Sequence, residues 1–293
     1  MRLNELEVLQ LLKDKLIEAA KVKGTELTDS DFGSQRWKMS KKNVYYLDKY
    51  QKNLFENPGP KTKLGTGVEA VRSSAAMIFN LLGEEYFVLD KKDYSDIKYE
   101  QGFKAILDEI EGSHEAHLDT VFKSSDKTEM YAVEAKLLEW KDSPKNLAKA
   151  YLDKRMYYAT NKNCQSFIDF FQSLILQEQD SYGRYKHLTK RYDAIQMTIH
   201  TLALYNHFSK ATNATIKKLT LLNVVWRYDC DEYAIEEQEA QEYIKKANSR
   251  FAPLFKQIGI DFSIQYSTFQ DFMQRIDFSN APKRFEYLKR YEI

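Results

Sequence analysis

Alternating hydrophobic and polar positions predict a β-hairpin in the middle of the chain. Its strands cover residues 113–122 and 130–138, and a loop rich in Ser, Lys and Asp joins them. Side chains alternate between the two faces of a strand, and residues directly opposite in an antiparallel pair share a face. If Asp119 lies opposite Glu134, then Glu134 and Lys136 share its face, and the apolar residues between them point into a core.

The remaining pattern predicts a chain that mixes helices with a few strands. Apolar residues at helical spacing predict helices over residues 3–21, 41–55, 68–82, 99–110, 142–160, 164–180, 191–207 and 236–250. Pro144 is placed at the first position of the helix over 142–160, and Pro253 is expected to end or kink the one over 236–250. Short apolar or alternating runs predict strands over 86–89, 219–226 and 261–269. The nearly unbroken apolar run 219–226 indicates a strand covered on both faces.

Composition narrows the class of protein. The 293 residues are 43% hydrophobic, which is ample for a core, and the net charge of +1 gives no global basic field. Any nucleic-acid surface must therefore be a local patch. Cys164 and Cys230 are far apart and are expected to be reduced. The N-terminus lacks the features of a signal peptide, and no apolar stretch reaches the length of a membrane span, so we expect a cytoplasmic protein with no membrane partner.

The residues Asp119, Glu134 and Lys136 suit one kind of chemistry. Two nearby carboxylates repel each other unless a cation lies between them, and their hard oxygens suit Mg²⁺, with Mn²⁺ as a substitute. A metal held there would activate water for phosphodiester hydrolysis, and Lys136 would orient that water or offset developing charge. The alternative is a chance Glu-x-Lys on a solvated edge, and Glu139 with Lys141 is a second example. Glu134 and Lys136, however, lie in an apolar run, where burying charge is costly.

This constellation resembles the PD-(D/E)XK nuclease superfamily, specifically a group of uncharacterised bacterial restriction-endonuclease-like proteins. A helix at residues 72–83 precedes the hairpin, a helix with Gln196 and His200 follows it, and the strand 219–226 comes next. The resemblance covers roughly residues 65–270, and Leu118 stands where the name-giving Pro would be. It implies an α+β fold, with a restriction-endonuclease-like core of a central mixed β-sheet flanked by helices, and with extra N-terminal helices.

The proline- and glycine-rich residues 56–67 mark a boundary or exposed loop. With the resemblance, this divides the chain into an N-terminal helical extension, residues 1–60, and a nuclease domain, residues 61–293. The resemblance also adds site residues. Glu69 is a candidate metal ligand from the first helix, with an ordinary first-turn glutamate as the alternative. Alternation along the strand, rather than the resemblance, places Glu115 on the same face as Asp119, as a further metal ligand or a solvated strand end. Gln196 resembles a helix glutamine that faces the site in some members, and a plain polar helix position is the alternative.

The resemblance implies the activity of a Mg²⁺-dependent deoxyribonuclease, an endonuclease by class, that acts in defence or repair. Double-strand cleavage would suit a homodimer that matches the two-fold symmetry of DNA. Basic and aromatic residues alternate around Tyr182, Tyr185 and Tyr192, which suits phosphate contact and base stacking. The candidate DNA contacts are Arg72, Ser73, Lys123, Lys145, Lys186, Lys190 and Arg191. Two alternatives remain: a catalytically inactive nuclease fold that binds nucleic acid or protein, and a mostly helical interaction protein without a site.

Overall fold

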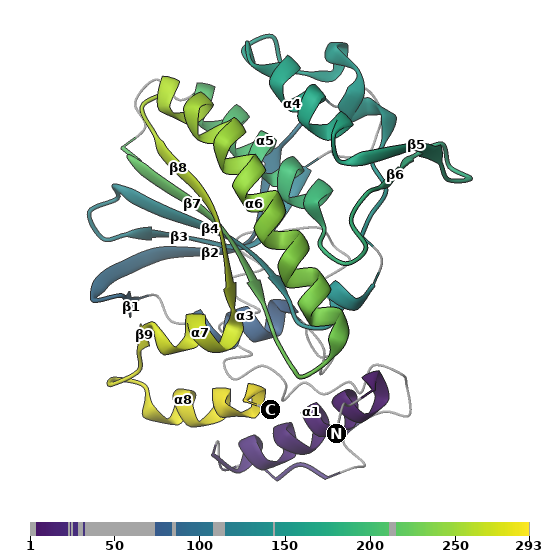
Figure 1. Cartoon of the computed structure of the whole chain (residues 1–293). Helices are drawn as coiled ribbons and strands as arrows, with labels where there is room; N and C mark the ends of the chain where they lie inside the picture. Colours follow the sequence, from purple (N-terminus) through teal and green to yellow (C-terminus); the bar gives the residue numbers. More distant parts are fainter. Residues whose placement is uncertain are drawn as a thin grey trace.

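A computed structural model describes residues 4–22, 24, 26–28, 32, 74–83, 86–107, 115–142, 144–210 and 215–292. The fold is mixed α/β, with a large curled sheet flanked by helices (Figure 1). The sheet contains β1 (Phe87–Leu89), β2 (Lys92–Lys104), β3 (Glu115–Ser124), β4 (Glu129–Lys136), β7 (Lys218–Val225), β8 (Asp261–Thr268) and β9 (Ile276–Asp277). The helices are α1 (Glu5–Val22), α3 (Ser74–Leu82), α4 (Cys164–Gln172), α5 (Ala194–Lys210), α6 (Asp231–Gln257), α7 (Phe269–Gln274) and α8 (Pro282–Leu288).

The strand order is β8-β7-β4-β3-β2-β1-β9. Strands β2, β3 and β4 form an antiparallel meander, whereas β4, β7 and β8 run parallel to one another. Parallel neighbours need a crossover connection, and here α5 lies between β4 and β7 in the chain, and α6 between β7 and β8. All residues of β7 after Lys218 are buried, which confirms the prediction of a strand covered on both faces.

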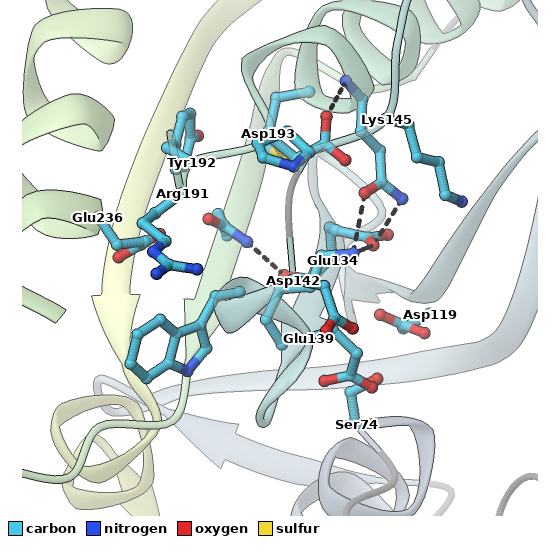
Figure 2. Close-up of a pocket in the computed structure, with 16 residues that line it drawn as sticks. Ser74, Asp119, Glu134, Glu139, Asp142, Lys145, Arg191, Tyr192, Asp193 and Glu236 are labelled. Carbon is cyan, nitrogen blue, oxygen red and sulfur yellow. Dashed lines mark hydrogen bonds and ion pairs between the residues drawn. The ribbon is translucent and has the colours of Figure 1, made fainter. Parts of the chain in front are cut away.

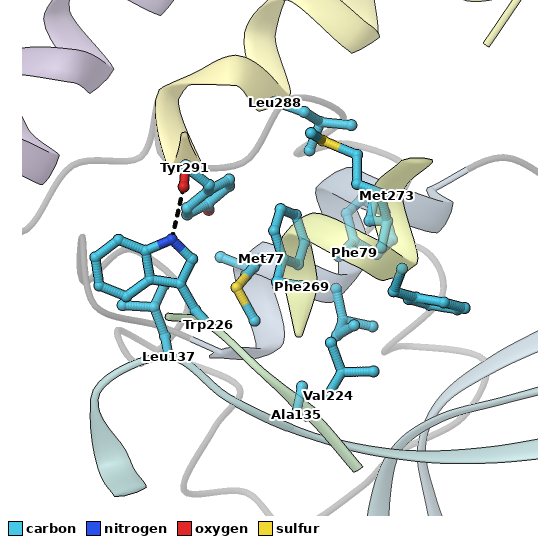
Figure 3. Close-up of a cluster of buried hydrophobic side chains, with 14 of the residues drawn as sticks. Met77, Phe79, Ala135, Leu137, Val224, Trp226, Phe269, Met273, Leu288 and Tyr291 are labelled. Atoms are coloured by element: carbon cyan, nitrogen blue, oxygen red, sulfur yellow. Dashed lines mark hydrogen bonds between the residues drawn. The ribbon is translucent and has the colours of Figure 1, made fainter. Parts of the chain in front are cut away.

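Two hydrophobic cores lie on the two faces of the sheet. One joins α1, α3, α7 and α8 to Val133 and Ala135 of β4 and to Leu137, which follows that strand. Figure 3 shows Ala135 and Leu137 in this core. The other packs α4, α5 and α6 against residues such as Ala132. The alternation along β4 is therefore the one that the sequence predicted.

Helix α1 packs on α8, which closes the first core at the end of the molecule where both termini lie (Figure 1). Its buried residues include Leu9, Leu12 and Leu16, so the apolar stripe predicted for this helix is docked on the rest of the chain. Trp226 follows β7, and its indole N–H donates to the Tyr291 carbonyl at 2.7 Å. That bond ties the C-terminal segment to the sheet.

The helix predicted over residues 99–110 is wrong for the part that the structure describes, because residues 92–104 form β2. The positive φ angles of Asp96 (51°) and Glu100 (50°) and a register shift between Ser95 and Lys98 interrupt the two-residue alternation. The buried aromatic residues Tyr94, Tyr99 and Phe103 are then five and four residues apart, which imitates the spacing of a helix.

The helix predicted over 142–160 is also wrong. This segment contains short 3₁₀ turns at Lys149–Leu152 and Lys154–Met156. Leu147 is held extended because it exchanges two backbone hydrogen bonds of 2.9 Å with Tyr185. Tyr185 belongs to β6 (Tyr185–His187), which pairs with β5 (Ile175–Gln179) in a separate hairpin, so the helix predicted over 164–180 ends early, at Gln172.

Helix α6 continues through Pro253 to Gln257, although the sequence predicted that it would end or kink there. A proline inside a helix costs about 3 kcal/mol, because it removes a hydrogen bond and crowds the preceding turn. Burial of Phe251 and Phe255 on the second core offsets this, and the Phe255 ring stacks on Phe262 of β8 with centroids 4.0 Å apart. The two cysteines, Cys164 and Cys230, have free thiols. In the described part of the chain, no helix is both long enough and apolar enough to cross a bilayer.

Candidate functional site

Strands β3 and β4 stop pairing with each other at the site. Their ladder ends at Thr120 opposite Val133, and the next pair in that register would be Asp119 and Glu134. Beyond this point each strand pairs only with its outer neighbour, β3 with β2 and β4 with β7. Where the backbone ladder ends, the Asp119 carboxylate accepts a hydrogen bond of 2.7 Å from the Ala135 backbone N–H.

A pocket of about 300 Å³ opens beside this divergence (Figure 2). Of the described residues that line it, six are acidic and three are basic, so the pocket concentrates negative charge and attracts cations. The acidic residues are Asp119, Glu134, Glu139, Asp142, Asp193 and Glu236, and the basic ones are Lys136, Lys145 and Arg191. Figure 2 places Asp119, Glu134 and Glu139 around one side of the pocket and Glu236 on the other side.

Glu134, Lys136 and Gln196 form a closed triangle of hydrogen bonds. The Lys136 ammonium donates to Glu134 Oε1 at 2.7 Å and to Gln196 Oε1 at 2.8 Å, and Gln196 Nε2 donates to Glu134 Oε1 at 2.8 Å. His200, one turn further along α5, places Nε2 3.2 Å from Glu134 Oε2. The carboxylate of Glu134 is therefore held on one side by β4 and on the other by α5.

Gln196 reaches this position because α5 begins beside it. The Asp193 carboxylate accepts a hydrogen bond of 2.9 Å from the Gln196 backbone N–H, as an N-cap residue does for the first turn of a helix. Gln196 and His200 are four residues apart and lie on the same face of the helix. The spacing along α5 thus aims both side chains at Glu134.

Lys136 keeps its proton in this setting. Burial by itself would lower the pKa of the ammonium, but the nearby carboxylates of Glu134, Asp193 and Glu139 together outweigh burial and raise that pKa above its ordinary value. At neutral pH the side chain is a half-buried cation. This charge state suits orientation of an anion or a water molecule and does not suit a general base.

A polar row crosses the parallel part of the sheet next to Glu134. Asn223 of β7 is paired with Glu134 and donates to its backbone carbonyl at 3.0 Å, and Tyr266 of β8 is paired with Asn223. The Tyr266 hydroxyl donates to Glu236 of α6 at 2.6 Å. Burial raises the pKa of Glu236 to about 7, with a smaller contribution from Glu237.

The sequence analysis did not predict that Asn223, Tyr266 and Glu236 belong to the site. Asn223 stands alone inside the apolar run 219–226, which is a signal that could have drawn attention to it, because a buried amide needs partners. Tyr266 and Glu236 carry no comparable local signal. Their approach depends on the order of the strands and on where α6 crosses them.

The other residues singled out by the sequence are dispersed. Lys145 and Arg191 line the pocket. Lys123 of β3 forms an ion pair with Asp96 of β2, Lys186 pairs with Glu178 on the β5–β6 hairpin, and the exposed Lys190 follows that hairpin.

Glu115 does not line the pocket and lies 3.6 Å from Nε2 of His117 near Gly102, so the alternation that placed it beside Asp119 does not bring it to the site. Glu69, Arg72 and Ser73 lie outside the described residues, as does the boundary expected at residues 56–67.

The donor set bears on which metal the site would suit. Asp119 and Glu134 offer carboxylate oxygens, and Mg²⁺ is commonly held by one or two carboxylates together with water and phosphate oxygens. Two acids from adjacent strands therefore fit Mg²⁺ in donor chemistry. Within the described part of the chain, no group of three or more His, Cys, Asp or Glu side chains is placed to hold a metal ion.

Comparison with known proteins identified no matching family model, no matching curated protein and no matching solved structure.

Proposed function

We propose that this protein is a Mg²⁺-dependent nuclease that hydrolyses DNA phosphodiester bonds. The observation that carries the proposal is the Glu134–Lys136–Gln196 triangle in a pocket that Asp119 shares, at the place where β3 and β4 diverge. Burial of the Glu134 carboxylate and of most of the Lys136 side chain costs free energy even with these hydrogen bonds, and a functional role accounts for that cost. A divalent ion and a phosphate are ligands that such a site would recognise.

The order of elements supports a restriction-endonuclease-like core. Helix α3 precedes the meander β2–β3–β4, helix α5 follows it, and β7 then pairs with β4 in parallel. This is the helix, hairpin, helix and strand order on which the sequence resemblance depends. The acids and the lysine come from the two central strands of this unit, and Gln196 comes from its second helix.

Asp119 and Glu134 would hold the metal. The chemistry that a bound divalent ion supplies is polarisation of a phosphoryl oxygen and a lower pKa for a bound water. The protonated Lys136 would bind a non-bridging phosphate oxygen and offset the charge that develops on phosphorus. Gln196 would keep the ammonium in place, because its amide oxygen accepts one of the three N–H bonds of Lys136.

Lys145 and Arg191 would position the DNA strand at the rim. The Lys145 side chain is exposed and Arg191 is half-buried, with its guanidinium donating to the Lys141 backbone carbonyl. Cations in this arrangement can contact phosphates that flank the scissile bond. The negative pocket between them would then be balanced by the divalent ion.

Cleavage of plasmid and linear DNA by the full chain tests the proposal. Wild type is expected to cut both with Mg²⁺ and neither with EDTA, and Asp119→Asn and Lys136→Ala are expected to abolish cutting. Lys246→Ala is the matched control, because Lys246 is an exposed lysine of α6 that lies outside the pocket and is not among the candidate DNA contacts. Cutting that persists in both site variants would remove this pocket from consideration.

A non-catalytic module that binds nucleic acid or protein is the second candidate. One observation favours it: both oxygens of Glu134 already lie within 3.2 Å of Lys136, Gln196 or His200. An ion would have to compete with these groups. No cutting with Mg²⁺ or Mn²⁺, together with salt-sensitive retention of DNA, would select this function over the nuclease.

A further inference from the structure

The β5–β6 hairpin is an arm that extends away from the main sheet (Figure 1). Four of the five residues of β5 are exposed, so this strand does not contribute a face to either core. At the tip, the Tyr182 side chain is 82% exposed. The ring therefore contributes to neither core and is accessible to a ligand.

The tip is held in one conformation. Asp180 accepts hydrogen bonds from the backbone N–H groups of Tyr182 and Arg184, at 2.9 and 3.0 Å, and from the side chains of Arg184 and Asn146. The bond from Asn146, followed by those from Arg184, holds the pKa of Asp180 well below its ordinary value. Gly183 takes the positive φ (71°) that the turn requires. Arg184 lies over the Tyr182 ring, 5.1 Å from its centroid.

The arm is connected to the candidate site in two places, through the partner of Tyr185 and through the segment that follows β6. Tyr185 of β6 pairs with Leu147, which is three residues after the pocket residue Pro144. After β6 the chain passes through Lys190 and enters the pocket at Arg191. A nucleic-acid strand that lies along the arm could therefore follow this segment of the chain to the pocket.

The charge of this region differs from that of the whole chain. Residues 144–155 and 176–191 contain eight Lys or Arg and three Asp or Glu, whereas the complete chain has 44 and 43. The Lys149 ammonium lies beside the tip, 3.8 Å from where a Cβ on Gly183 would be. This is a local basic surface with an aromatic group at its end, a combination that suits a single nucleic-acid strand.

We infer that the β5–β6 arm binds single-stranded DNA, with Tyr182 stacked on an unpaired base and Lys149 at a neighbouring phosphate. The inference rests on the proposed function and narrows its substrate to DNA with a single-stranded segment next to the cleavage site. Paired bases inside a duplex have both faces covered by stacking, so an exposed ring gains most from a base that is not paired. A preorganised tip loses little conformational entropy when it binds.

Fluorescence anisotropy with EDTA present tests the arm separately from cleavage. The ligand is a labelled oligonucleotide, either single-stranded or annealed to its complement, and the protein is the full chain. Tyr182→Ala is expected to raise the Kd for the single strand roughly tenfold and to leave the Kd for the duplex unchanged. Tyr182→Phe keeps the ring and is expected to bind both like wild type. Tyr86→Ala, at another exposed tyrosine, is the matched control.

Salt dependence tests the phosphate contact. Lys149→Ala is expected to reduce the slope of log K against log salt for the single strand by about 0.7, the value for one phosphate contact. Lys283→Ala is the control, because α8 lies at the opposite end of the molecule (Figure 1).

The arm and the nuclease proposal can fail separately. An unchanged single-strand Kd in Tyr182→Ala, an equal loss on both ligands, or no binding of either ligand by wild type would overturn the arm, even if the protein cuts DNA. Selective loss of single-strand binding in a protein that does not cut DNA would support the arm and contradict the nuclease.

Discussion

The carboxylate of Asp119 holds the backbone N–H of Ala135 at 2.7 Å. This side chain does for the end of β4 what a backbone carbonyl of β3 does further along the ladder. It also lines the pocket, so one residue both joins the two diverging strands and contributes charge to the site. These two roles can be separated by substitution.

Asp119→Asn should separate them. The amide oxygen can accept the same hydrogen bond, so the free energy of unfolding is expected to stay within about 1 kcal/mol of wild type. Asp119→Ala leaves the buried Ala135 N–H without this acceptor, and is expected to cost about 1–3 kcal/mol. Urea unfolding measures both. Equal destabilisation by the two variants would show that the hydrogen bond is not what stabilises the strand end, and cleavage by Asp119→Asn would show that the charge is not needed.

Gln196→Ala should weaken cleavage while leaving the ion pair of Glu134 and Lys136 in place. The ammonium loses the acceptor that fixes its direction, and small misplacements of a reacting group can reduce rates by about a hundredfold. Single-turnover cleavage of a linear DNA would measure the effect. Gln165→Ala removes a comparable side-chain hydrogen bond on the exposed face of α4 and is expected to cut normally. Equal rates in the two variants would count against a positioning role for Gln196.

Glu236 should make stability depend on pH. Burial raises its folded-state pKa from 4.5 to about 7, so the native protein binds this proton more tightly than the unfolded chain does. The stabilisation from protonated Glu236 is fully present below pH 4.5 and is lost as the pH rises through about 7. The loss is of order 3 kcal/mol, which corresponds to the size of the pKa shift.

The variant Glu236→Gln should remove this loss, because the amide stays neutral and can still accept from Tyr266. Chemical unfolding between pH 4.5 and 8 is expected to give a flatter stability profile than wild type. Glu242→Gln, on the exposed side of the same helix, is the control and should follow wild type. A profile for Glu236→Gln that parallels wild type would mean that other groups cause the pH dependence.

Trp226→Phe should loosen the C-terminal segment. The ring can still pack in the first core, but the Tyr291 carbonyl loses its indole donor, at an expected cost of about 1–3 kcal/mol. Hydrogen exchange of the α8 amides should accelerate more than that of α5, which belongs to the other core. Uniform acceleration throughout the chain would instead indicate a general loss of stability.

The sequence was sufficient for the hairpin and its register, because both depend on local alternation and a short turn. Asp119 does fall opposite Glu134 in the extended register of β3 and β4. The sequence was insufficient for β2, where residues with positive φ break the alternation. It was also insufficient for Leu147, because the extended backbone there depends on a strand almost forty residues away in the chain. Elements fixed by distant partners leave little trace in their own residues.

The same limit applies to the pocket. Glu134 and Lys136 are two residues apart on one strand, so the sequence could predict that they share a face. Gln196 was predicted from the resemblance. Asn223, Tyr266 and Glu236 converge only after β7 and β8 have taken their places beside β4. The sequence around Glu115 also could not show that this residue lies outside the site. Glu115 lies beside His117 near Gly102 and away from the pocket.

The contact between α1 and α8 joins segments about 270 residues apart, which has a consequence for biosynthesis. A ribosome makes α1 about 270 residues before α8, so the apolar stripe of α1 lacks one of its packing partners while the residues between them are synthesised. During that interval it is a surface that a chaperone can occupy. Contacts this far apart also slow folding after release, so the first core should be the last part of the molecule to become resistant to proteases.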